Sequence, residues 1–196
     1  MALREGARIV LHIVPLESFR SSSIFNLIPT KEDKDNFQPM EWLSSDSRFN
    51  LDGILTYSCP TPSHDYLQVF RNGIIEAVDV FLSLGDTTIP SEGYEKGLLN
   101  YLPRLAMIQK KLGVEPPLFI MLSVLGVKDC TMHREWSFGE AHPIDRDTLV
   151  IPEVLVETLD FDATQTMKPA FDAVWNAAGH PRSMNYDENG KWVGGR

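Results

Sequence analysis

The sequence of 196 residues lacks several features that would assign it to a common class of protein. It contains only two cysteines, Cys59 and Cys130, so the disulfide framework of a small secreted fold is excluded. Acidic residues outnumber basic ones by 27 to 18, which gives a formal net charge of −9. A chain whose main task is to neutralise nucleic-acid phosphates needs clustered Lys and Arg instead. We therefore do not expect nucleic acid to bind to this domain alone.

The chain also lacks a long apolar run. The longest one, from Pro116 to Val127, is well short of the roughly 20 residues that cross a bilayer as a helix. No N-terminal stretch has the layout of a signal peptide. We therefore expect no contact with a membrane and a location in the reducing cytoplasm, with both thiols free or bound to a metal.

Three common catalytic motifs are missing as well. The sequence has no Gly-x-Gly-x-x-Gly dinucleotide fingerprint, no Gly-x-x-x-x-Gly-Lys phosphate loop and no Gly-x-Ser-x-Gly nucleophile elbow. Nucleotide hydrolases of the phosphate-loop kind and α/β-hydrolases are therefore unsupported. This pattern favours a domain that is not an enzyme.

What the sequence does contain is a series of β-branched and apolar runs that are typical of buried strands. They span Arg8–Val14, Asp52–Ser58, Tyr66–Arg71, Ile74–Val80, Leu118–Leu125, and a pair interrupted by Pro152, Thr148–Ile151 and Val154–Thr158. Asn72-Gly73 predicts a hairpin with a type I′ turn, because that turn needs positive φ at both central residues. In the strand after this turn, Asp79 shares a face with Ile75 and Ala77.

Two segments show helical periodicity. The first begins at Ser91, which we expect to cap it, and ends at Gly113, with a kink or a break expected at Pro103. The second runs from about Thr166 to Ala178, with Pro169 in its first turn. Because strands and helices do not alternate regularly, we expect an α+β fold in which an antiparallel or mixed β-sheet carries two main helices.

We expect a single domain over residues 1–182, followed by a polar C-terminal tail over residues 183–196 in which Trp192 is the one candidate anchor. Residues 16–50 show little periodicity but carry five aromatic residues: Phe19, Phe25, Phe37, Trp42 and Phe49. We expect these rings to hold the stretch on the core. Such a set could also cover a ligand pocket or form a partner surface.

Four residues could form a zinc site. Cys59 and His64 are separated by four residues, and Cys130 and His133 by two. Structural zinc takes four such ligands in a tetrahedron, and each pair lies at the end of a predicted strand. The spacings match no standard zinc finger, so two inert thiols and two surface imidazoles are the alternative. Zinc is the one cofactor that the sequence suggests.

The connection over residues 128–147 is rich in groups suited to acid–base chemistry, namely Glu135, Glu140, His142, Asp145 and Asp147. A carboxylate beside a histidine can act as a base, and Arg146 could bind an anion. A solvated loop that turns the chain before a strand explains the same residues. We interpret His12, inside an apolar strand, as a hydrogen-bonded core histidine.

Several stretches together indicate a family: Glu5–Pro15, Arg48–Tyr57, Val69–Ala77, Gly113–Pro117, and Trp175–Gly179 with Arg182 and Ser183. Over residues 5 to about 192, the chain resembles the C-terminal region of bacterial Schlafen-AlbA-type proteins, which are often labelled DNA-binding or ATP-binding. In that family an AlbA-like module implicated in nucleic-acid or nucleotide work precedes this region, and nothing in this sequence corresponds to that module. The resemblance implies a C-terminal domain and carries no catalytic residue onto these positions.

The leading hypothesis is a non-catalytic accessory domain that acts in regulation, sensing or oligomerisation and binds a protein partner or a second copy of itself. One alternative is a small-molecule or metal-binding sensor, or a hydrolase, built on the 128–147 connection. Another is weak nucleic-acid binding through an arginine face formed by Arg71, Arg134 and Arg182.

Overall fold

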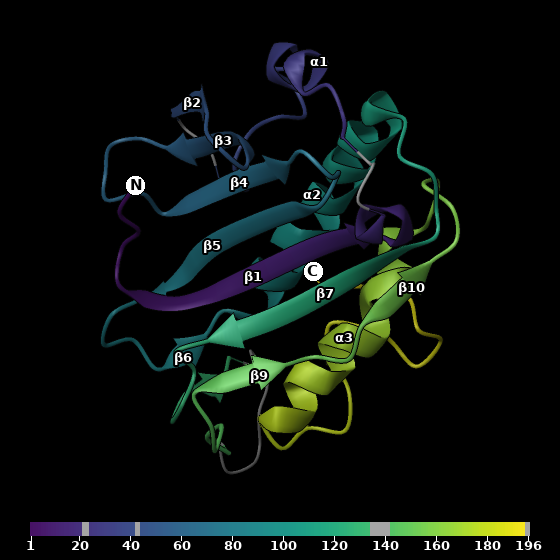
Figure 1. Ribbon diagram of the computed structural model, residues 1–196. Coiled ribbons are helices and arrows are strands. Elements are labelled where there is room, and N and C mark those ends of the chain that lie inside the picture. The colour runs from purple at the N-terminus through teal and green to yellow at the C-terminus, as the bar shows by residue number, and fades with distance from the viewer. Residues whose placement is uncertain (21–23, 42–43, 134–141, 195–196) are drawn as a thin grey trace.

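The structure is a computed structural model and describes residues 1–20, 24–41, 44–133 and 142–194 (Figure 1). Its main sheet contains β1 (Gly6–Pro15), β2 (Ser45–Phe49), β3 (Gly53–Ser58), β4 (Asp65–Phe70), β5 (Ile75–Ser83), β7 (Leu118–Leu125), β9 (Thr148–Val150) and β10 (Val154–Val156). The strand order is β10-β7-β1-β5-β4-β3-β2, and β9 also pairs with β7. All of these pairs are antiparallel.

The strands β9 and β10 form one interrupted edge of this sheet. β9 pairs with the C-terminal half of β7, and β10 pairs with its N-terminal half. Pro152 lies between the two and has no N–H to donate to a ladder, which explains why the edge breaks there. This arrangement confirms the expectation of a strand pair interrupted by Pro152.

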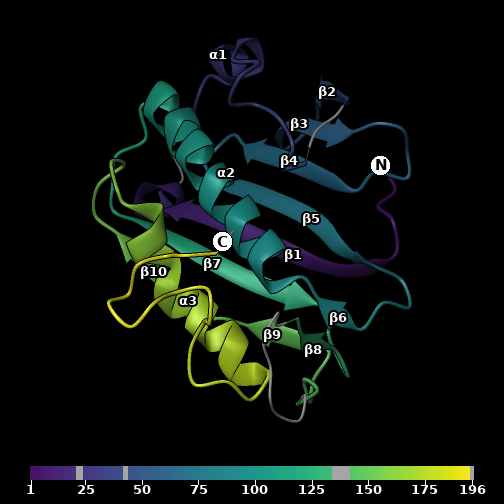
Figure 2. The ribbon, with the colours of Figure 1, turned by 180° about the vertical axis from the view of Figure 1, so that it is seen from behind.

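Two long helices, α2 (Ser91–Leu112) and α3 (Ala163–Ala177), lie on the same face of the sheet (Figure 2). Their apolar stripes, which include Leu98 and Leu105 of α2 and Phe171 of α3, are fully buried against it. Each such side chain contributes roughly 1.5–3 kcal/mol through burial. The α+β class, the antiparallel sheet, the two main helices and the single domain are thus as expected from the sequence.

Several shorter elements were not expected. These are the 3-10 helix η1 (Leu16–Phe19), the helix α1 (Ile28–Glu32), the strand β2, and the two-residue strands β6 (Thr88–Ile89) and β8 (Thr131–Met132), which pair in parallel. Among the described residues, no helix is both long and apolar enough to cross a membrane.

The helix ends differ from expectation in detail. Ser91 does not cap α2, because its hydroxyl donates to the backbone carbonyl of His133 and Pro90 occupies the cap position. α2 continues through Pro103 as one helix and ends at Gly113, whose φ of 75° is left-handed, as the sequence predicts. α3 begins earlier than expected, because the side chain of Asp162 accepts hydrogen bonds from two backbone N–H groups of the first turn. Pro169 therefore lies beyond the first turn.

The β4–β5 hairpin is present, but its loop has three residues instead of two. The N–H of Phe70 donates to the carbonyl of Ile74, and the N–H of Gly73 donates to the carbonyl of Phe70. Only Gly73 has positive φ, at 86°, so the turn is not of type I′. A three-residue loop with a left-handed glycine is the next commonest solution, and it shifts the register between the strands by one residue.

The stretch over residues 16–50 is only partly held by its aromatic rings. Phe37 is buried in the core, and Phe25 packs where a side chain at Gly73 would otherwise lie. Phe19 and Phe49 are exposed instead, while Trp42 lies outside the described residues. The expectation that the rings pin this stretch to the core therefore applies to two of the four described rings.

Candidate functional site

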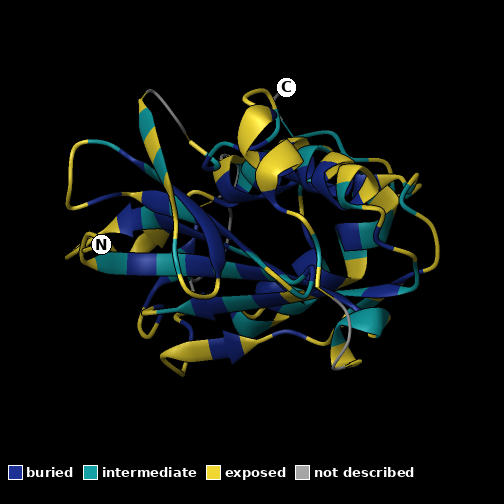
Figure 3. Ribbon diagram, turned by 45° about the horizontal axis from the view of Figure 1, so that its top comes forward, coloured by how far each residue is buried: buried dark blue, intermediate teal, exposed yellow. Residues whose placement is uncertain are grey.

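The two faces of the main sheet have different surroundings. Along β1, the odd-numbered residues from Ala7 to Ile13 are buried under α2 and α3, and the even-numbered residues from Arg8 to Val14 point the other way. β7 and β9 show the same alternation, whereas β3, β4 and β5 are buried at most positions (Figure 3). In the part of the chain that the structure describes, both long helices cover one face, and we call the opposite face the uncovered face (Figures 1 and 2).

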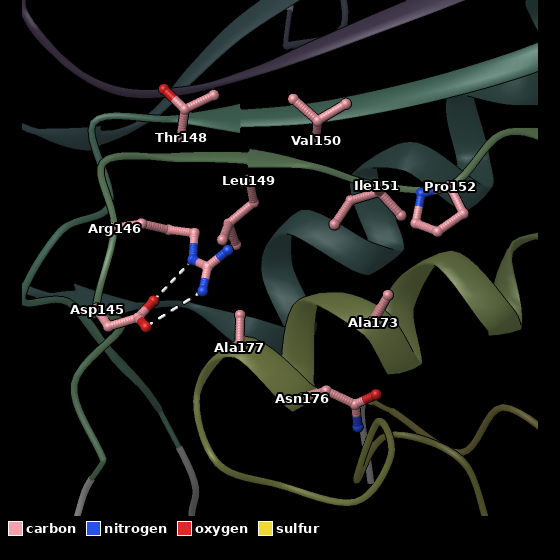
Figure 4. Close-up of a pocket in the computed structure, with 10 residues that line it drawn as sticks. All are labelled: Asp145, Arg146, Thr148, Leu149, Val150, Ile151, Pro152, Ala173, Asn176 and Ala177. Atoms are coloured by element: carbon pink, nitrogen blue, oxygen red, sulfur yellow. Dashed lines mark hydrogen bonds and ion pairs between the residues drawn. The ribbon is translucent and has the colours of Figure 1, made fainter.

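One half of the uncovered face is apolar. It is built by β1, β7, β9 and β10, and we define this apolar half by Val10, Phe119, Met121, Leu125, Val150 and Leu155. Val150 is 77% exposed and Leu155 is 52% exposed. Figure 4 shows the side chains of Thr148 and Val150 directed away from α3, while Leu149 points towards it. Apolar side chains thus stand in water along this edge of the sheet.

The other half carries a short hydrogen-bonded chain of side chains from three adjacent strands. His12 of β1 lies directly opposite Glu76 of β5, and its Nε2 is 2.8 Å from Oε2 of Glu76. The hydroxyl of Tyr66 on β4 donates to Oε1 of the same carboxylate at 2.7 Å. The hydrogen bond from His12 lowers the pKa of Glu76 against the effect of burial. Burial, followed by the hydrogen bond to Glu76, raises the pKa of Tyr66.

This chain corrects one sequence-based interpretation. His12 is hydrogen-bonded, as expected, but it belongs to the uncovered face and its side chain is 33% exposed. Tyr66 and Glu76 also line a cavity of about 400 Å³, whose wall includes Gln68 and the N-terminal residue Met1. The Glu76 carboxylate orients the partly exposed imidazole of His12, so this side chain can form a hydrogen bond with a partner molecule.

The charges on the uncovered face balance. The charged side chains at its outward strand positions are Arg8, Arg48, Asp46 and Glu76, two of each sign. The surplus of acidic residues that gives the chain its net charge of −9 therefore lies elsewhere. The outward strand positions of this face therefore carry no net charge, which lowers the repulsion that a second acidic surface would meet there.

The four residues of the predicted zinc site are not brought together. Cys59 follows β3 and His64 precedes β4, whereas Cys130 and His133 flank β8 in the small sheet. Among the described residues, no group of three or more His, Cys, Asp or Glu side chains is placed to hold a metal ion. Cys130 is buried, and burial raises the pKa of its thiol. A metal ligand needs the thiolate instead.

The chemistry-bearing residues of the 128–147 connection are solvated where the structure describes them. His142, Asp145 and Asp147 are exposed, while Glu135 and Glu140 lie outside the described residues. Asp145 accepts two hydrogen bonds from Arg146, at 2.7 and 3.2 Å, on the rim of a cavity of about 550 Å³ between β9 and α3 (Figure 4). Arg146 therefore already has an anionic partner.

The arginines that were considered for nucleic-acid binding are used within the chain. The guanidinium of Arg71 donates to the carbonyls of Asn50 and Leu51, and that of Arg182 donates to the carbonyls of Tyr186 and Asp187. Arg134 lies outside the described residues.

A buried carboxylate that the sequence analysis missed holds the C-terminal segment. Glu95 of α2 is 0% exposed and accepts hydrogen bonds from Trp175, Ser183 and Trp192. Burial raises the pKa of Glu95, and these hydrogen bonds oppose the shift. Ser183 and Tyr186 are buried as well, so part of the segment after residue 182 packs into the core and Trp192 is one of several anchors. The sequence signal was weak because the partners lie 80 to 97 positions from Glu95.

The comparisons with known proteins identify no relative. No family model, no curated protein and no solved structure matches the chain. The likeness to the Schlafen-AlbA type therefore stays a prediction, and function has to be argued from the geometry of the described residues.

Proposed function

We propose that this protein is a non-catalytic accessory domain that self-associates, and that the apolar half of the uncovered face is the contact surface between two copies. The observation that supports it is the exposure of Met121, Val150 and Leu155 on a sheet face that no long helix of the described chain covers. In this proposal, the covered face stabilises the fold and the uncovered face binds the second copy.

An antiparallel sheet often has one face in water, but that face then alternates polar residues with the buried ones. Here the outward residues of β7 are Phe119, Met121, Ser123 and Leu125, three of which are apolar. Contiguous apolar patches on a protein surface mark interaction sites. A second sheet packs at about 10 Å from the first and would bury such a patch.

Charge favours a second copy as the occupant. Two copies of a chain with a net charge of −9 repel each other, and a face whose local charge is balanced reduces this repulsion at the contact. The outward strand positions of this face carry Arg8 and Arg48 against Asp46 and Glu76. A twofold contact places the same patch on both copies, so an apolar strip matches itself. A stable contact of this kind buries about 1,600 Å² in total.

The same proposal includes a cellular location and a family for the domain. We infer a cytoplasmic accessory domain of the Schlafen-AlbA type, in which pairing of this domain brings two effector modules together. Two observations agree with this setting: both cysteines are free thiols, and no described helix can cross a membrane.

Sedimentation velocity over a wide range of protein concentration tests the proposal. We expect a reversible monomer–dimer equilibrium whose Kd rises at least about tenfold in Met121→Lys, which corresponds to roughly 1.4 kcal/mol. Leu84→Lys is the matched control, since Leu84 is equally apolar and 73% exposed but follows β5 outside the patch. A wild-type protein that stays monomeric at every concentration, or an equal effect of both substitutions, would rule out this surface.

A further inference from the structure

Two aspartates on neighbouring strands are buried on the covered face of the sheet. Asp65 of β4 and Asp79 of β5 are direct cross-strand partners, and they share the helix-covered face with Leu67 and Ala77. Asp65 is 0% exposed and Asp79 is 4% exposed. Side chains at directly opposed positions have Cβ atoms about 4.5–5.5 Å apart, which lets two carboxyl groups touch.

The hydrogen bonds of this pair are incomplete. Oδ2 of Asp65 accepts from the backbone N–H of Glu41 at 2.7 Å, whereas Oδ1 of Asp65 is buried without a partner. Within the described ranges, no lysine, arginine or histidine forms an ion pair with either carboxyl group. Two buried carboxylates without a cation are strongly unfavourable, so one charge has to be removed.

The surroundings of the pair contain a cation, Arg104 of α2, but within the described ranges it forms no ion pair with either carboxyl group. The carboxyl of Glu41 adds a further negative charge from the segment before β2, and Ile9 of β1 lies on the other side of Asp79. From α2, Tyr101 and Arg104 face the region. The Tyr101 hydroxyl donates to the carbonyl of Gln38, and the Arg104 guanidinium lies over the Tyr101 ring with Nε and one Nη buried and without a hydrogen-bond partner.

We infer that Asp65 and Asp79 form a proton-binding site, in which a proton held by Asp79 is donated as a hydrogen bond to the unpartnered Oδ1 of Asp65. The shared proton removes one of the two charges and satisfies the orphaned oxygen at the same time. Burial, and then the charges of Glu41 and Asp65, raise the pKa of Asp79 to about 8. Paired carboxyl groups that share one proton behave in this way in general.

The site is coupled to the segment over residues 38–41. This segment is attached to the core by the Glu41 N–H on Asp65 and by the Tyr101 hydroxyl on Gln38. When the proton leaves, two adjacent negative charges remain beneath the first of these attachments. The protonation state of the pair therefore affects how firmly residues 38–41 are attached to the core, and loss of the proton weakens this attachment.

A divalent cation is the rival occupant, because hard cations also bind paired carboxylates. Within the described part of the chain, however, no third carboxylate, histidine or cysteine stands close enough to complete such a site. Both occupants can be distinguished by experiment.

The test is the unfolding equilibrium constant measured by denaturant titration between about pH 5 and about pH 9 in the wild type, Asp79→Asn and the control Asp86→Asn. Asp86 is an exposed aspartate in the turn after β5. We expect unfolding of the wild type and of the control to become about tenfold more favourable for each pH unit up to about 8. Asp79→Asn, whose amide can donate to Asp65 in place of the proton, should be stabilised at the alkaline end and lose this slope. A wild-type slope no steeper than that of Asp79→Asn would overturn the inference.

Infrared spectra of the wild type supply a measurement that does not depend on a variant that folds. A protonated carboxyl carbonyl band should be present near neutral pH, disappear at about pH 9 and be absent from Asp79→Asn. Added Mg²⁺ or Ca²⁺ should leave the unfolding constant unchanged. If either ion stabilises the wild type but not Asp79→Asn, the site binds a cation and the proton assignment is wrong.

Discussion

The two faces of the main sheet are built by the same strands and differ in almost every physical respect. On the covered face, Ile9, Leu11 and Leu67 are completely buried beneath two helices. On the uncovered face, their immediate neighbours Val10, His12 and Tyr66 are only partly buried. One strand therefore builds the core with every second residue and leaves the alternate residues partly exposed.

Substitutions at two neighbouring residues of β1 should show the largest difference in stability between the two faces. Leu11→Ala should lower the free energy of unfolding by about 2–5 kcal/mol, because it opens a cavity under the helices. Val10→Ala removes a smaller and partly exposed side chain and should lower it by less than about 1 kcal/mol. Urea titration at neutral pH measures both values. Equal losses in the free energy of unfolding would contradict the difference between the covered and the uncovered face.

Glu95 provides the next largest effect, on the covered side. Glu95→Ala should destabilise the protein by about 2–3 kcal/mol, because the donors of Trp175, Ser183 and Trp192 lose their acceptor in a buried place. Glu95→Gln keeps a carbonyl acceptor and should be less damaging. Unfolding by denaturant reports the loss, and so does tryptophan fluorescence, to which Trp175 and Trp192 contribute two of the four tryptophans. If both variants retain wild-type stability, the C-terminal segment is not held by this residue.

The uncovered face should respond to pH in the opposite direction from the Asp65–Asp79 pair. The pKa of Glu76 is lowered in the folded protein, so its contribution to stability is complete above the unfolded value and is lost as the pH falls through the lower folded value. The raised pKa of Asp79 makes stability fall as the pH rises from about 4 to about 8.

Because Glu76 is partly exposed, its contribution should be less than about 1 kcal/mol. Comparison of the wild type with Glu76→Gln between about pH 6 and about pH 3 measures it. A variant that follows the wild-type curve over this range would contradict a stabilising role of the His12–Glu76 hydrogen bond.

The smallest effect on stability is expected at the exposed edge. Val150→Thr should change the free energy of unfolding by no more than about 0.5 kcal/mol, since Val150 is 77% exposed and threonine keeps the β-branched shape. In sedimentation, however, the same variant should weaken self-association. A loss of stability without any change in association would place Val150 in the fold and not in the contact surface.

The strands and helices of the core could be predicted because each shows its own periodicity. The prediction for β7, Leu118 to Leu125, agrees with the structure at both ends, and Gly113 ends α2 as expected. β2, β6 and β8 have no such periodicity. Short strands of this kind form where a neighbouring strand has backbone groups free for hydrogen bonding, and their own composition does not predict them.

The candidate sites depended on details that the sequence does not specify. Alternation correctly placed Asp79 on the apolar side of its strand, but a two-residue loop at Asn72-Gly73 would have set it opposite Tyr66. The three-residue loop moves the register by one position and brings Asp79 opposite Asp65. The zinc set depends on such a detail as well, because the short spacings within Cys59–His64 and Cys130–His133 say nothing about the distance between the two pairs. In the ranges that the structure describes, no group of three or more His, Cys, Asp or Glu side chains is placed to hold a metal ion.

The interruption at Pro152 has a consequence for how copies of this protein can assemble. The edge of the sheet formed by β9 and β10 offers at most three consecutive residues, in either strand, to a neighbouring backbone. An incoming chain therefore cannot extend the ladder into a continuous ribbon, which is the route by which exposed sheets grow into fibres. At this edge, the interruption at Pro152 therefore disfavours open-ended growth of the sheet.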